Sequence, residues 1–79
     1  VSKEDIETII RQFSPSVVGI HNFRSRQVGP QIFLDFHIEI RGEDDFKRAH
    51  TMTESIIQRI QDRYPGADVT VHFDPEGEM

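Results

Sequence analysis

The sequence predicts a small α+β domain, an open-faced two-layer sandwich with the element order α-β-β-α-β. Two stretches carry apolar residues at helical spacing and three carry them in alternation, and proline or glycine stands at most of the junctions. A three-stranded mixed sheet with two helices on one face fits this order, because the long second helix can return the chain as a third strand. The expected fold is ferredoxin-like with one strand fewer, and it leaves one sheet face uncovered.

The first element is a short amphipathic helix. Ser2 can cap its N-terminus together with Asp5, three residues further on, in a near capping box. Ser14-Pro15 is expected to end the helix, because the residue before a proline is disfavoured in helical geometry. The apolar residues between these signals share one helical face: Ile6, Ile9, Ile10 and Phe13.

A β-hairpin is predicted next. Residues 17–26 form its first strand, with Val18 and Ile20 facing inward, and Gly29-Pro30 marks the turn. Residues 32–40 form the clearest strand of the chain, because apolar and polar residues alternate along all of it. The inward set is Ile32, Leu34, Phe36, Ile38 and Ile40, and the outward set is Phe33, Asp35, His37 and Glu39.

The second half predicts a longer helix and a last strand. Gly42 ends the preceding strand, and the acidic residues 43–45 suit the positive end of a helix. Pro65-Gly66 ends that helix. Its buried stripe is Phe46, Ala49, Thr53, Ile56, Ile57, Ile60 and Tyr64. The last strand turns Val69, Val71 and Phe73 inward and Thr70, His72 and Asp74 outward, and Asp74-Pro75 closes it.

Charge and composition exclude several classes of partner. The 79 residues form one domain, 1–79, with 14 acidic and 9 basic side chains and a net charge of -5. Residues 1–41 have no net charge, so the excess of negative charge lies in residues 42–79. Nucleic acid and anionic membrane surfaces attract basic proteins, so neither is an expected partner. The acidic excess suits a cation, or serves only solubility. Because there is no cysteine, thiolate metal sites and disulfides are excluded.

No feature of the sequence indicates an enzyme or a membrane span. The chain has no phosphate-binding glycine loop, no nucleophile-elbow motif and no H-E-x-x-H helix. No apolar run approaches about 18 residues, and no signal peptide precedes Lys3 and Glu4. A start on Val1 predicts that the chain has been cut from a longer one. Only 35% of the residues are hydrophobic, so the expected core is small, and a dimer partner or a metal would help to stabilise it.

The strand phases bring ligand-type side chains together on the uncovered face. His21, His37 and His72 point away from the helices, and Asp74 follows His72 on the same side. Imidazole and carboxylate are the ligands that Zn²⁺ takes where thiolate is absent, and Asp74 could bridge a second ion. Asp35 and Glu39 are interpreted as solvated groups, or as groups that contact the metal ligands rather than the metal. Phe23 and Phe33 are also expected on this face, which would suit a dimer surface.

The fourth histidine, His50, lies on the second helix and does not obviously reach the uncovered face. It would have to enter at the end of the sheet or from a partner chain. A different interpretation also stays open. A histidine on a strand is usually a half-exposed polar residue, so the chain could be a small-molecule regulatory domain of the ACT type. It could equally be a plain dimerisation module with incidental histidines.

Several short motifs, in order and at the right spacing, carry a family resemblance over nearly the whole chain. They are residues 18–26, Gly29-Pro30, Phe36-His37-Ile38-Glu39, Ala49-His50, residues 64–69 and Val71-His72-Phe73-Asp74-Pro75. With them the chain resembles the C-terminal cytosolic domain of cation diffusion facilitator transporters, which export zinc, iron or manganese. The cysteine that some members carry near the C-terminus is absent here.

The resemblance implies a function. The family's domain forms a V-shaped homodimer at the cytoplasmic face of the cell membrane, below a membrane domain of the same chain that is absent here. It implies two close ions, with Asp74 as the bridge, held by His21, His37, His50, His72 and Asp74. Zn²⁺ is the first expectation, and Fe²⁺, Mn²⁺, Co²⁺ or Cd²⁺ would also be accepted. Metal binding is expected to draw two domains together and bias the membrane helices towards transport, with no small-molecule substrate.

Overall fold

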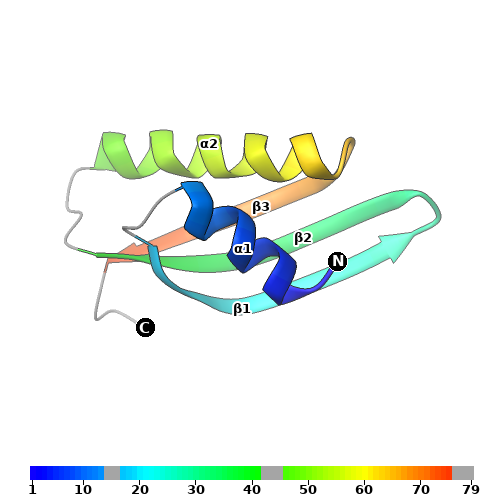
Figure 1. Ribbon diagram of the computed structural model, residues 1–79, viewed down its shortest axis with the longest axis horizontal. Helices are drawn as coiled ribbons and strands as arrows, with labels where there is room; N and C mark the ends of the chain where they lie inside the picture. Colours follow the sequence, from blue (N-terminus) through cyan, green and yellow to red (C-terminus); the bar gives the residue numbers. More distant parts are fainter. Residues whose placement is uncertain (14–16, 42–45, 76–79) are drawn as a thin grey trace.

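The computed structural model, which describes residues 1–13, 17–41 and 46–75, confirms the predicted order of elements (Figure 1). The predicted helix end at Ser14-Pro15 and the acidic segment 43–45 after Gly42 lie outside the described residues, as do the side chains of Phe13, Val18 and Phe46. The elements are α1 (Lys3–Phe13), β1 (Val17–Val28), β2 (Gln31–Ile40), α2 (Phe46–Arg63) and β3 (Asp68–Pro75).

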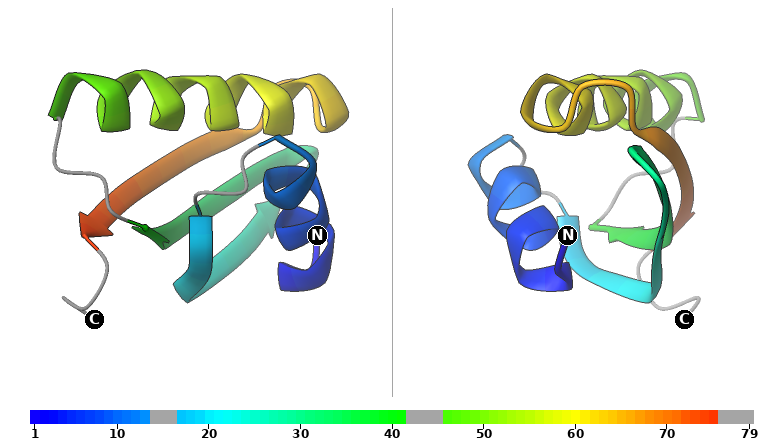
Figure 2. Two further views of the ribbon diagram at one scale, coloured as in Figure 1. Left: turned by 60° about the vertical axis from the view of Figure 1, so that its left-hand side comes forward. Right: turned by 90° about the vertical axis from the view of Figure 1, so that its right-hand side faces the viewer.

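The sheet is mixed and β2 is its central strand. β1 pairs with β2 antiparallel, β3 pairs with β2 parallel, and the order across the sheet is β1-β2-β3. Figure 2 shows a strongly twisted sheet with both helices on its concave side. The two-layer sandwich with one uncovered sheet face is therefore confirmed for the described chain.

The core lies between the helices and the concave face of the sheet. Alternate residues of β2 are fully buried there, from Leu34 to Ile40, as the alternation predicts. Both helices contribute to the same cluster, so each turns its apolar stripe to the sheet. The buried apolar residues of this cluster are Ile6, Ile10, Ile20, Leu34, Phe36, Ile38, Ile40, Ala49, Ile56 and Ile60.

Caps and turns hold the element ends in place. Asp5 N–H donates to Ser2 Oγ at 3.2 Å and Ser2 N–H donates to Asp5 Oδ2 at 3.4 Å, which confirms the capping box. Gly66, with φ +83°, turns the chain between α2 and β3. Gln31 Nε2 donates to the Gly66 carbonyl at 2.8 Å, so the turn is tied to the start of β2.

The prediction that Phe23 lies on the uncovered face is wrong. β1 contains a β-bulge, because three residue steps from His21 to Arg24 oppose two steps from His37 to Asp35. Asn22 adopts a left-handed φ of 55° at this point. The extra residue reverses the phase of the strand, and Phe23 packs against Phe36 on the helix side with ring centroids 6.0 Å apart. Arg24 then takes the position on the uncovered face.

Candidate metal centre

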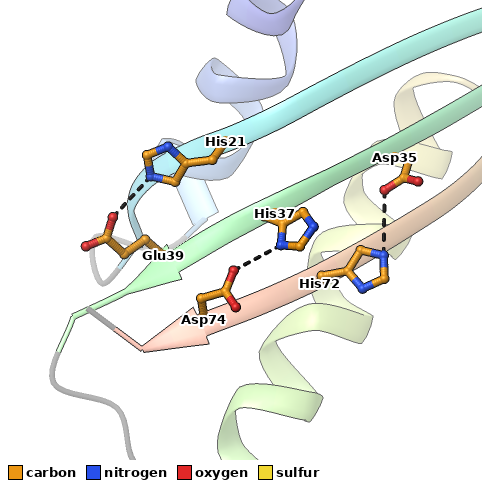
Figure 3. Close-up of polar contacts among 6 residues, drawn as sticks. All are labelled: His21, Asp35, His37, Glu39, His72 and Asp74. Atoms are coloured by element: carbon orange, nitrogen blue, oxygen red, sulfur yellow. Dashed lines mark hydrogen bonds and ion pairs between the residues drawn. The ribbon is translucent and has the colours of Figure 1, made fainter. Parts of the chain in front are cut away.

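Three histidines form a row across all three strands of the uncovered face (Figure 3). His21 of β1 is directly opposite His37 of β2, and His37 is directly opposite His72 of β3. Directly paired residues project to the same side of a sheet, so the register alone places the three imidazoles side by side. The predicted common face of these side chains is therefore present.

His37 and His72 are the most closely associated pair of the row. Their rings stack with centroids 4.7 Å apart and planes inclined by 23°. Asp74 lies one pleat further along β3, and its Oδ2 is 3.0 Å from Nδ1 of His37. Both histidines border a hollow of about 150 Å³, which Asn22 and Arg24 also line. A hollow of that volume has room for several water molecules, and hence for a hydrated ion.

The other two histidines of the row also have a carboxylate neighbour on the central strand. Nε2 of His21 is 3.1 Å from Oε1 of Glu39, and Nε2 of His72 is 3.6 Å from Oδ1 of Asp35 (Figure 3). The sequence placed Glu39 and Asp35 on this face but left their contacts open. The missing information was the register, which sets each carboxylate diagonally beside its imidazole.

His50 does not join the row within one chain. It lies on α2, whose layer is separated from the uncovered face by the sheet itself. Its side chain is 60% exposed, and its Nε2 contacts Oε1 of Glu54, one helical turn later, at 2.6 Å. Within one chain, the contact with Glu54 therefore leaves His50 on the helix layer and outside the row.

The donor set fits a borderline divalent cation, although the side chains are not yet arranged around one. Imidazole nitrogen and carboxylate oxygen are ligands for Zn²⁺ at about 2.0–2.2 Å. Among the described His, Asp and Glu side chains, no three converge closely enough to hold an ion as they stand. Convergence on one ion would require rotation of the imidazole rings about their side-chain torsions.

The charges of the uncovered face favour a cation. The positions paired across the strands place Asp35, Glu39, Asp68 and Asp74 there, against Arg24 and Arg26. Within the described residues of this face, carboxylates thus outnumber guanidinium groups. The guanidinium of Arg26 lies 4.8 Å from the centre of the Phe33 ring, at the end of the sheet away from Asp74.

Comparisons with known proteins identify the family. The sequence profile described as "Cation efflux protein, cytoplasmic domain" matches residues 1–76. The cation-efflux pump FieF of Klebsiella pneumoniae is 37% identical over 73 residues, which are 92% of this chain and 24% of that protein. The chain therefore spans about a quarter of the length of the curated relatives it matches.

Two solved structures share the fold closely. The metal-bound C-terminal domain of the CzcD transporter from Thermotoga maritima superposes with a TM-score of 0.85 at 34% identity, covering 96% of this chain and 88% of that one. The cytosolic domain of a cation diffusion facilitator family protein superposes with a TM-score of 0.83 at 33% identity, covering 95% and 89%. Within the part of the chain that the structure describes, no helix is both long and apolar enough to cross a membrane. The chain belongs to the family of cytoplasmic domains of cation efflux proteins.

Proposed function

We propose that this chain is the metal-binding regulatory domain of a divalent-cation efflux transporter. The observation that carries the proposal is the row of His21, His37 and His72 across the uncovered sheet face, with Asp74 in contact with the central imidazole. The matched relatives are described as cation-efflux pumps and transporters, and one of the similar solved domains is described as metal-bound. These descriptions support a role in cation handling rather than in catalysis.

The ligands proposed for the metal are His21, His37, His72 and Asp74 of one chain. His50 would complete the site from a second chain, because the sheet separates it from the row within its own chain. Asp74 has two oxygens and would bridge two ions. The donor types accept Zn²⁺ first, and Fe²⁺, Mn²⁺, Co²⁺ or Cd²⁺ also match them.

Dimerisation supplies the proposed link to transport. Two acidic chains repel one another, each with a net charge of -5, and divalent cations held at the uncovered faces would offset that repulsion. A cation that binds the dimer more tightly than the separated chains must stabilise the dimer by the same free energy. Two domains drawn together in this way would bias attached membrane helices towards transport. The transport step itself would belong to those helices.

Equilibrium dialysis against Zn²⁺ together with sedimentation velocity tests the proposal. We expect more than one tightly bound ion per chain and a species of about twice the 9.2 kDa chain mass. Zinc should increase the fraction of chains in that species. A dimer that binds no zinc would instead mark a plain dimerisation module. A monomer at micromolar concentration, with and without zinc, would contradict the dimer.

A further inference from the structure

Gly19 lies beneath the imidazole of His21. The two residues are separated by one position on β1, and Gly19 is directly opposite Glu39 of β2. A Cβ built onto Gly19 would be 3.1 Å from Nε2 and 3.5 Å from Cε1 of His21. A side chain at position 19 would therefore be in tight contact with the ring, which would have to shift by a few tenths of an ångström.

The backbone itself does not require glycine at this position. Gly29 and Gly66 are the glycines with a left-handed φ among the described residues, and Gly19 is not one of them. The backbone of Gly19 thus lies outside the left-handed region that favours glycine. The nearest atoms that a Cβ at position 19 would meet all belong to the His21 ring.

In this position the His21 ring directs one of its two nitrogen atoms towards a carboxylate. Nε2 of His21 is 3.1 Å from Oε1 of Glu39, whose side chain is 18% exposed (Figure 3). Because an ionised carboxylate only accepts hydrogen bonds, we assign the hydrogen of the His21 ring to Nε2 as the donor. In a neutral imidazole the lone pair is then on Nδ1, and this is the atom that can bind a cation.

We propose that Gly19 and Glu39 are positioning residues for His21 and that His21 binds its divalent cation through Nδ1. The inference rests on the proposed metal-binding function. A carboxylate on the far nitrogen fixes the tautomer and the orientation of a ligand imidazole and increases its basicity. Gly19 contributes the space in which the ring can lie while it makes that bond.

The pair of His21 and Glu39 differs from the neighbouring contact of His37. The carboxylate on His37 is Asp74, a proposed ligand, so that hydrogen bond has to be exchanged when an ion binds. Glu39 is not among the ligands proposed for the two ions. Its bond to His21 can persist in the loaded domain, which is what orienting a ligand requires.

Two substitutions test the inference. Gly19→Ala should displace the ring, and Glu39→Gln should replace the anionic acceptor by a neutral amide of the same shape. Each should weaken Zn²⁺ binding, measured by competition with a chromogenic chelator, about 10- to 100-fold. The matched controls are Ser25→Ala on the same strand and Asp62→Asn on α2, and both should bind zinc like the parent. Melting of the zinc-free variants shows whether each one is folded.

Nitrogen-15 spectra of the imidazole rings provide the second readout. In the zinc-free parent at pH 8, His21 should be the Nε2–H tautomer, and zinc should shift the Nδ1 resonance. Gly19→Ala and Glu39→Gln should mix the tautomers. Zinc on Nε2 of His21, or parent-like affinity in both folded variants, would overturn this inference while the proposed function stands. A parent chain that binds no zinc would overturn the proposed function and this inference with it, whatever tautomer His21 shows.

Discussion

His37 and His72 hold directly opposite positions on the parallel strands β2 and β3, and their imidazole rings stack 4.7 Å apart. The lone pair of an imidazole nitrogen lies in the plane of the ring, so two stacked rings aim their lone pairs side by side rather than at one point. An ion bound by both at about 2.1 Å brings the two nitrogen atoms to within about 4 Å. Metal binding is therefore expected to turn side chains while the sheet register stays fixed.

Replacing Asp74 with alanine should cost more bound zinc than replacing any single histidine. Its carboxylate lies beside the central imidazole, and as a bridge it would serve two ions at once. We expect the zinc content per chain, measured by equilibrium dialysis and elemental analysis, to fall by more than one ion. Asp74→Asn should have nearly the same effect, because an amide is a poor bridging ligand.

Asp62→Ala is the matched control for this loss. Asp62 is exposed on α2 and accepts a hydrogen bond from Gln58, away from the uncovered face. Its removal lowers the acidic charge by the same amount, so it reports any general electrostatic effect on zinc uptake. Equal losses in the Asp62 and Asp74 variants would show that bulk charge, not the proposed site, holds the zinc.

His50→Ala should remove one ion and leave the other bound. Within its own chain His50 lies on α2 in contact with Glu54, so we expect it to serve an ion shared with a second chain. The remaining ion should depend little on protein concentration, whereas the ion lost in the variant should require the dimer in the parent. Dialysis over a dilution series measures both, with Asp62→Asn as the control that should retain every ion.

The fold could be predicted from the sequence because its signals are local and repeated. Five alternate apolar positions from Ile32 to Ile40 fix the inner face of β2, and the spacing of Ile56 and Ile60 fixes that of α2. Positions near an irregularity could not be predicted in the same way. One extra residue at Asn22 reverses the direction of every later side chain of β1, so regular alternation predicts the wrong face for Phe23.

The site could be predicted to its face but not to its contacts. Alternation places His37 and His72 on the outer side, yet their direct pairing depends on a register that no local pattern encodes. The same holds for Glu39, whose contact with His21 crosses from one strand to the next. The role of Gly19 could not be predicted from the sequence, because it depends on where the His21 ring lies in the folded chain.

Asn22→Val should destabilise the domain, whereas Asn22→Gly should not. Asn22 adopts a left-handed φ of 55°, which costs a β-branched residue about 1–2 kcal/mol and costs glycine almost nothing. Urea denaturation of the zinc-free chain measures the difference. Ser25→Val, at an exposed position of regular pairing on the same strand, should be tolerated. An Asn22→Val variant as stable as the parent would contradict the bulge.

Zinc should stabilise the domain strongly at pH 7.5 and much less at pH 5.5. A protonated imidazole has no lone pair for a metal, and the pKa of a free imidazole side chain is about 6.5. Protons therefore compete with zinc for the imidazole nitrogen atoms as the pH falls below about 6.5. The stabilisation by zinc decreases as the pH is lowered. At free zinc about 100 times its dissociation constant, each independent ion should add roughly 2.7 kcal/mol to the free energy of unfolding.

Thermal melting with and without zinc at the two pH values makes this measurable, since about 1 kcal/mol moves the melting temperature of so small a domain by about 4–8 °C. The zinc-free chain should melt cooperatively at both pH values, because its core is buried without any metal. The variant His37→Ala, which lacks the central imidazole of the row, should show a smaller zinc shift at pH 7.5 than the parent. An equal zinc shift at both pH values would falsify histidine ligation, because carboxylates alone stay ionised throughout that range.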